Sequence, residues 1–154
     1  TSVRKRQKKN PKFYFFDTGV KRALERTLTV KLVEKTYAFG DAFEHFVVIE
    51  ILRLAQYLFP DWQCSYLSAP SGAEVDLIID RPGQPVVLIE IKSTDAITHR
   101  DSKTLNRFVS DFPACKALCL SRDTNRMKME NVLCLHWQDG LRELGLRGNG
   151  SQTH

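Results

Sequence analysis

The sequence predicts an α/β fold in which helices flank a mixed central β-sheet. Three observations lead to this class. Apolar residues recur at helical spacing from Asp41 to Phe59, two β-rich runs flank a Pro/Gly loop at residues 81–85, and a helical pattern followed by two short strand-like runs lies further along the chain. With 154 residues, of which 42% are hydrophobic and 27% charged, the chain is long enough for one domain with a single core.

The elements are expected in a definite order, and the division of the chain follows from them. They are an aromatic strand-like run at 12–16, a short helix at 17–26, the main helix at 41–59, strands at 62–68, 74–80 and 86–92, a helix at 98–112, strands at 116–121 and 132–137, and a short helix at 139–146. Pro60 and Pro113 mark the ends of the two longer helices. We therefore divide the chain into a basic N-terminal arm (1–11), a domain (12–146) and a flexible tail (147–154).

Composition excludes several classes of protein. No apolar run approaches the roughly 20 residues that a membrane span needs, and no signal-peptide pattern opens the sequence. We therefore expect a cytoplasmic protein without membrane contact. The four cysteines show no C-x-x-C spacing, so we expect core thiols rather than zinc ligands or a disulfide framework.

The net charge of +5 is concentrated in the first part of the chain. Residues 1–26 hold nine Lys or Arg against two acidic residues, so the remaining 128 residues carry a net charge of −2. The candidate phosphate-binding residues of the arm are Arg4, Lys5, Arg6, Lys8 and Lys9. Such an arm strengthens nucleic-acid binding by releasing counterions, in which case removal of residues 1–9 weakens the salt dependence of binding. The alternative is a charge run that is only solvated.

The two β-rich runs of the expected hairpin carry polar residues among apolar neighbours. Side chains alternate between the faces of a strand, so Glu74 and Asp76 share one face, as do Glu90 and Lys92. If the two runs pair so that partner numbers sum to 166, Asp76 lies opposite Glu90 and Glu74 lies opposite Lys92. All four side chains then point the same way.

Two opposed carboxylates repel each other, because their Cβ atoms lie roughly 4.5–5.5 Å apart. Mg²⁺ or Mn²⁺ would neutralise Asp76 and Glu90, which would supply hard oxygen ligands while water fills the remaining positions. With Lys92 beside the metal, such a site has the groups needed to hydrolyse a phosphodiester. The alternative is an exposed strand face that carries ordinary Asp and Glu–Lys pairs.

Two helices add candidate residues. Glu44 falls on the inward stripe of the main helix, which places a carboxylate towards the sheet; the alternative is a capping-box-like pair with Asp41 at the helix start. His45 is expected at the surface. The polar side of the helix at 98–112 carries Arg100, Lys103 and Arg107, which either meet a phosphate backbone or form an ordinary solvated face.

These residues resemble a known motif. Asp76, a gap of thirteen residues and Glu90-Ile91-Lys92 are similar to the motif of the PD-(D/E)XK nuclease superfamily, in which an Asp and a Glu bind Mg²⁺ and a Lys assists catalysis. The Pro is absent, and Glu74-Val75-Asp76 resembles the variant in an uncharacterised domain at the C-terminal end of many archaeal and bacterial AAA-type ATPases. That family also resembles this chain at residues 12–19 and at Gly40-x-x-x-Glu44.

The resemblance covers roughly residues 10–145 and implies a restriction-endonuclease-like core. It implies an active-site set of Glu44, Asp76, Glu90 and Lys92, with Glu74 as an accessory residue. The implied function is metal-dependent cleavage of DNA beside an ATPase domain, and this sequence contains no G-x-x-x-x-G-K-[ST] phosphate loop. Two alternatives stay open: a catalytically idle module that mediates protein contacts or regulation of an ATPase, and a non-catalytic nucleic-acid binder that uses the basic arm.

Overall fold

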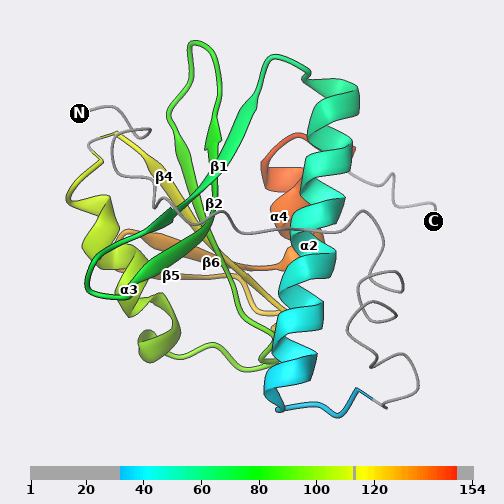
Figure 1. Ribbon diagram of the computed structural model, residues 1–154, viewed down its shortest axis with the longest axis vertical. Coiled ribbons are helices and arrows are strands. Elements are labelled where there is room, and N and C mark those ends of the chain that lie inside the picture. The colour runs from blue at the N-terminus through cyan, green and yellow to red at the C-terminus, as the bar shows by residue number, and fades with distance from the viewer. Residues whose placement is uncertain (1–31, 113, 149–154) are drawn as a thin grey trace.

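The computed structural model describes residues 32–112 and 114–148 (Figure 1). Its helices are α2 (Tyr37–Leu58), α3 (His99–Val109) and α4 (Trp137–Glu143), and its strands are β1 (Gln63–Ser68), β2 (Glu74–Asp80), β3 (Val87–Ile91), β4 (Lys116–Ser121), β5 (Met127–Met129) and β6 (Val132–His136). The basic arm, the elements expected at 12–16 and 17–26, and residues 149–154 of the tail lie outside the described residues.

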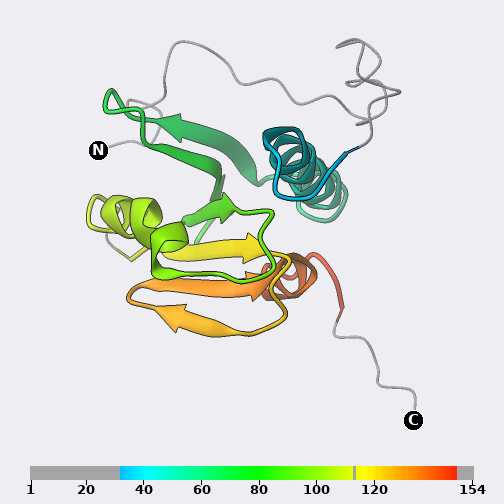
Figure 2. The same ribbon diagram turned by 90° about the horizontal axis from the view of Figure 1, so that it is seen from below.

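The strands form one mixed sheet, which confirms the predicted class at this level. Their order is β1-β2-β3-β4-β6-β5. β1, β2 and β3 pair antiparallel, β3, β4 and β6 pair parallel, and β5 returns antiparallel to β6. Helices α2 and α4 cover one face of the sheet and α3 covers the other (Figure 2).

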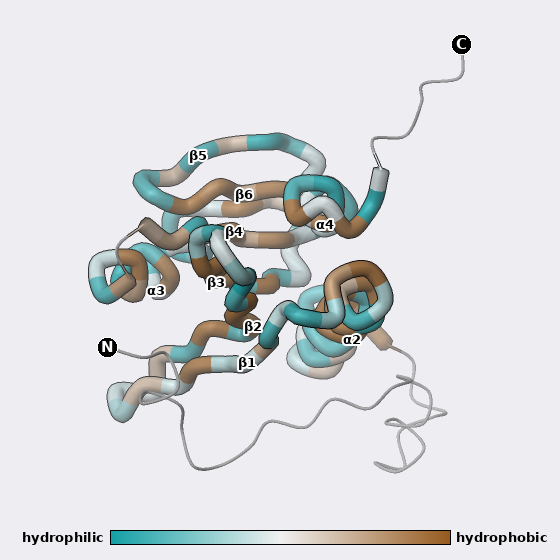
Figure 3. Tube along the Cα trace, turned by 90° about the horizontal axis from the view of Figure 1, so that it is seen from above, coloured by the Kyte–Doolittle hydropathy of each residue, from teal (hydrophilic) through white to brown (hydrophobic). Residues whose placement is uncertain are grey.

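Each face of the sheet is apolar and packs against its own helices. The cluster on the side of α2 and α4 includes Val47, Val48, Ile51, Leu77, Ile89, Leu120 and Leu141. The cluster on the side of α3 includes Val75, Ile78, Leu88, Leu105, Phe108, Cys119 and Cys134. The central strands are therefore hydrophobic along most of their length (Figure 3). All four cysteines are free thiols. Cys119 and Cys134 are buried in the core, as predicted, whereas Cys64 and Cys115 are only partly buried and pack against it.

Helix α2 begins earlier than the sequence predicted. Thr36 is its N-cap, and the Thr36 hydroxyl accepts a hydrogen bond from the backbone N–H of Phe39 at 3.3 Å. Asp41 therefore lies inside the helix, and the capping-box alternative for Glu44 is wrong. The surface placement of His45 is also wrong, because His45 is 2% exposed. It lies one helical turn before the buried Val48, so the inward stripe is wider than predicted.

The hairpin register agrees with the prediction where the two strands pair. Leu77 pairs with Ile89 and Ile79 with Val87, so the partner numbers sum to 166. On its other side, β2 contains a bulge: Ser65 of β1 pairs with Ile78, but Leu67 pairs with Val75. Val75 and Ile78 consequently lie in the same cluster. Side chains therefore do not alternate strictly between the two faces at Asp76. The prediction that Glu74, Asp76, Glu90 and Lys92 all point to one face of the sheet is wrong.

Strand β5 was not predicted. Its three residues, Met-Lys-Met, lack β-branched side chains and offer too short a pattern for recognition. Glu130, at a φ of 54°, makes the turn that returns the chain from β5 to β6. Among the described helices, none combines the length and apolar character needed to cross a bilayer.

Candidate active site

The site lies where β2 and β3 separate. Their paired positions end at Leu77 and Ile89. One step further, the Asp76 Oδ2 atom accepts a hydrogen bond of 2.7 Å from the backbone N–H of Ile91, and the backbone N–H of Lys92 donates to Leu120 of β4 at 2.9 Å. The end of β3 thus stays with β4, and the carboxylate of Asp76 takes the position of a ladder bond. This separation opens an edge at which polar side chains gather.

Glu90 is the most buried charged side chain of this edge. Its residue is 6% exposed, and its neighbours Ile89 and Ile91 both belong to the α2-side cluster, so the Glu90 side chain points to the α3 side of the sheet. There it lies beside Cys119, its partner on β4. The Glu90 Oε1 atom lies 2.9 Å from the Nζ atom of Lys92.

The second carboxylate oxygen of Glu90 is different. Among the described residues, no hydrogen-bond partner reaches the buried Oε2 atom of Glu90. Buried polar atoms are almost always hydrogen-bonded, and an unsatisfied charged group costs about 1–3 kcal/mol or more. An oxygen of this kind fits the donor set of a hard cation.

The charges around Glu90 and Lys92 are strongly coupled. Burial raises the pKa of Glu90 above its ordinary value, Lys92 lowers it, and the carboxylates of Asp101 and Glu44 raise it further, so the net shift is upward. Burial alone would lower the pKa of Lys92, but Glu90 and Asp76 raise it above the ordinary value. Lys92 therefore lies in the field of both predicted metal-binding carboxylates and keeps its positive charge.

Glu44 reaches this edge from α2. It is half-buried, and its charge acts on Glu90. The helix comes close to the end of β3 at Gly40, because a Cβ atom at that position would lie 3.6 Å from the hydroxyl of Ser93. The inward placement predicted for Glu44 is therefore consistent with its effect on Glu90.

Glu74 is less closely associated with the edge. It is exposed and accepts a hydrogen bond of 3.3 Å from the hydroxyl of Ser68 on β1. Because the ladder between β2 and β3 ends at Leu77, the structure does not pair Glu74 with Lys92. Its accessory role stays a prediction.

Asp101 is a residue that the sequence analysis missed. It forms a capping box with Thr98 at the start of α3, with its Oδ2 atom 2.8 Å from the Thr98 backbone nitrogen. Its charge also raises the pKa of Glu90. The T-x-x-D spacing was visible as a capping signal, but nothing local connects it with Glu90.

The residues fit a site with few protein ligands. Within the two described ranges, no group of three or more His, Cys, Asp or Glu side chains is arranged to hold a metal ion. Mg²⁺ commonly uses one or two carboxylates and keeps several water ligands. Asp76 and Glu90 satisfy that smaller requirement by residue type. The Oε2 atom of Glu90, which has no hydrogen-bond partner in the described part of the chain, supports this interpretation.

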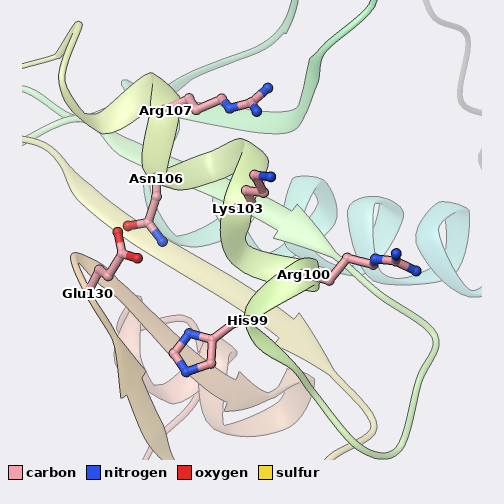
Figure 4. Close-up of a pocket in the computed structure, with 6 residues that line it drawn as sticks. All are labelled: His99, Arg100, Lys103, Asn106, Arg107 and Glu130. Atoms are coloured by element: carbon pink, nitrogen blue, oxygen red, sulfur yellow. The ribbon is translucent and has the colours of Figure 1, made fainter.

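The predicted cations of the second helix lie on the outer side of α3. Arg100, Lys103 and Arg107 are exposed, and they extend from the opposite side of α3 to His99 and Asn106 (Figure 4). They border a shallow hollow together with His99, Asn106 and Glu130. The cations predicted in the N-terminal arm fall outside the described residues.

Comparison with known proteins identifies a family. The model of a family described as "Domain of unknown function (DUF4143)" matches residues 39–138, which is 100 of the 154 residues. No curated protein matches the chain. A solved structure, described as a half-complex from a tetradecameric assembly of Thermococcus gammatolerans McrB AAA+ hexamers with bound McrC, contains a similar chain. The match has 13% identity and a TM-score of 0.46, and it covers 63% of this chain and 27% of that chain.

Proposed function

This chain belongs to the DUF4143 family of domains of unknown function, and we propose that it is a metal-dependent nuclease that hydrolyses phosphodiester bonds in DNA. The observation that carries this proposal is Glu90. A carboxylate that is buried, paired through one oxygen to Lys92 and without a partner at its other oxygen among the described residues is costly to maintain. Such groups occur preferentially at functional sites.

Each residue of the edge has one proposed role. Asp76 and Glu90 would hold Mg²⁺ or Mn²⁺, which supplies Lewis-acid chemistry and lowers the pKa of bound water when present. The ammonium group of Lys92, held by Glu90, stabilises negative charge on the phosphate. Glu44 approaches from the helix and adds negative charge that favours cation binding.

The finer identity of the fold belongs to the same proposal. A restriction-endonuclease-like core is supported by the separation of β2 and β3 at the predicted Asp and by the Glu-x-Lys run at the end of β3. Association with an AAA-type ATPase is supported by the sequence resemblance alone. We propose that such a partner delivers or gates the DNA.

A second candidate function is a catalytically idle module of an ATPase. The observation that favours it is the missing three-ligand group among residues 32–112 and 114–148. In this case the carboxylates at the edge are a remnant, and neither metal nor DNA is required.

Metal titration followed by a cleavage assay separates the two candidates. Mn²⁺ and Mg²⁺ are titrated into the full chain, which is then incubated with supercoiled plasmid, linear duplex and single-stranded DNA. Glu90→Gln and Asp76→Asn remove one charge each and are expected to abolish metal-dependent cleavage. Glu143→Gln removes a charge from another Lys–Glu pair and is the matched control.

The nuclease proposal fails if the wild type cleaves none of these substrates with either metal, both alone and with a co-purified ATPase partner. It also fails if Glu90→Gln cleaves at the wild-type rate, because the cleavage would then come from a contaminating nuclease or from another site.

A further inference from the structure

The outer side of α3 carries a row of three like charges. Arg100, Lys103 and Arg107 are spaced three and four residues apart, which places them along one side of the helix. Figure 4 shows the three side chains extending from the same side of the helix, and all three are exposed. At 1.5 Å per residue, the row is about 10 Å long from Arg100 to Arg107.

The helix itself does not explain this row. Like charges at these spacings are destabilising by about 0.2–0.5 kcal/mol per pair. Arg100 lies in the first turn, where the helix dipole disfavours a cation, and only Arg107 lies in the last turn, where it favours one. The arrangement therefore has a small energetic cost for the free protein.

Among the described residues, the three cations have no ion-pair partner, in contrast to several other basic side chains. Across the described part of the chain, ion pairs engage Lys92, Lys116, Arg122, Arg126, Arg142 and Arg147. No described residue forms an ion pair with Arg100, Lys103 or Arg107, although Glu130 borders the same hollow. Three adjacent cations are thus available to an external anion.

The hollow beside this row has a fixed wall. The side-chain amide of Asn106 donates to the backbone oxygen of Met129 at 3.5 Å, and its oxygen accepts from the backbone N–H of Asn131 at 3.2 Å. These bonds tie α3 to the turn between β5 and β6. The cations consequently extend from a helix held in place rather than from a mobile loop.

The row begins next to the candidate active site. Asp101, which follows Arg100, is close enough for its charge to act on Glu90. Glu90 also points to the α3 side of the sheet. The start of α3 also follows the end of β3 in the chain, so a polyanion that lies along the row from Arg107 to Arg100 would run toward the end of β3 that carries Glu90 and Lys92.

We infer that the outer side of α3 binds the phosphate backbone of a nucleic-acid strand and leads it to the Glu90–Lys92 edge. The inference rests on the proposed nuclease function for the identity of the polyanion, and it adds the surface that the strand follows. Regularly spaced phosphates match a linear row of cations, and backbone contact of this kind does not depend on base sequence.

A matched pair of double variants tests this inference in the full chain. Lys103→Gln/Arg107→Gln removes two charges from α3, and Arg142→Gln/Arg147→Gln removes two charges from exposed side chains at the α4 end of the chain. Binding of fluorescein-labelled single-stranded and duplex DNA is measured in EDTA at several salt concentrations, so that no cleavage occurs. In a competition experiment, polyglutamate and unlabelled DNA of equal charge are each used to displace the labelled DNA, so that two kinds of polyanion are compared.

The α3 variant should weaken binding and reduce the slope of log K against log salt by about 1.8 for duplex DNA, or about 1.4 for a single strand, since each lost phosphate contact contributes about 0.9 or 0.7. The α4 control should keep the wild-type slope. Equal slopes in both variants would overturn the inference, as would competition by polyglutamate as strong as that by unlabelled DNA of equal charge.

The binding experiment tests the α3 surface separately from the proposed nuclease chemistry. DNA binding that requires α3 without cleavage under any metal would refute the nuclease and leave the α3 surface in place. If cleavage requires Glu90 but the α3 variant binds DNA as tightly as the wild type, only the proposed α3 surface is refuted.

Discussion

Two Lys–Glu pairs in this protein have nearly the same geometry and opposite electrostatics. The Lys92 Nζ atom lies 2.9 Å from Glu90 Oε1, and the Lys116 Nζ atom lies 2.7 Å from Glu143 Oε1. The Glu90 side chain is 8% exposed and the Glu143 side chain 26%. The pKa of Glu90 is raised, chiefly by burial, whereas the hydrogen bond from Lys116 lowers the pKa of Glu143.

The difference comes from what surrounds the second oxygen. Glu143 Oε2 lies 3.7 Å from a nitrogen of Arg126, so both of its oxygens face a cation. Glu90 Oε2 has no hydrogen-bond partner among the described residues, and the nearby carboxylates of Asp101 and Glu44 oppose its charge. A Lys–Glu ion pair can therefore leave both carboxylate oxygens beside cations, as at Glu143, or leave one buried oxygen without a described hydrogen-bond partner, as at Glu90.

The largest contrast is expected in the rate of DNA cleavage. Lys92→Ala should keep metal binding but lower the rate by about two to four orders of magnitude, because it removes the cation beside the phosphate. Lys116→Ala should change the rate less than about threefold, since within the described part of the chain Lys116 forms its ion pair with Glu143 and with neither Asp76 nor Glu90. Single-turnover cleavage with saturating Mn²⁺ measures both. A comparable loss in the two variants would show that the pairs do not differ in function.

Metal stabilisation should distinguish the two glutamates next. A cation that binds only the folded protein adds about 2.7 kcal/mol to the free energy of unfolding at 100 times its dissociation constant. We expect Mn²⁺ to raise the melting temperature of the wild type and of Glu143→Gln but not that of Glu90→Gln. A shift that persists in Glu90→Gln would place the cation elsewhere.

The pH dependence of stability should differ in sign between the two pairs. Because the folded pKa of Glu143 is lowered, its stabilisation is present above the ordinary value of 4.5 and is lost as pH falls through the folded pKa. Glu143→Gln should therefore reduce the free energy of unfolding by about 0.5–1 kcal/mol at pH 7 and by less near pH 3. Urea denaturation at both pH values checks this, with Arg142→Gln as the control.

The smallest effect concerns Glu90 without metal. Because its folded pKa is raised, its contribution to stability is fully present below the ordinary value of 4.5 and is lost as pH rises through the folded pKa. In EDTA, Glu90→Gln should be as stable as the wild type at low pH and more stable at pH 8, by up to about 1 kcal/mol. Lower stability at pH 8 would mean that the Lys92 bond outweighs the burial cost.

Local patterns predicted much of the fold. The short Pro/Gly loop determined the β2–β3 register, and the apolar stripe of α3 at Leu105 and Phe108 was correctly predicted to face the core. The bulge at Asp76 was not predictable, because a bulge breaks the same alternation that a strand prediction assumes. Strand β5 depends on its pairing with β6 rather than on its own residues.

The candidate site stays a prediction, and it was made from residue type and not from arrangement. The spacing of Asp76, Glu90 and Lys92 selected the candidate residues, but the lack of a hydrogen-bond partner for one Glu90 oxygen among the described residues depends on burial under distant elements. His45 was misplaced because the width of a buried stripe depends on the neighbouring sheet. The influence of Asp101 on Glu90 likewise arises from the packing of α3 and has no local signal.

The hydrogen bond from Ile91 to Asp76 has a consequence for the history of the family. The side chain at position 76 holds the end of β3 whether or not a metal binds, and an Asn would serve that purpose equally well. If the proposed nuclease chemistry belongs to the family, relatives that lack it should still retain Asp or Asn at this position under structural selection alone. Substitutions at the positions of Glu90 and Lys92 would then distinguish relatives with the chemistry from those without it.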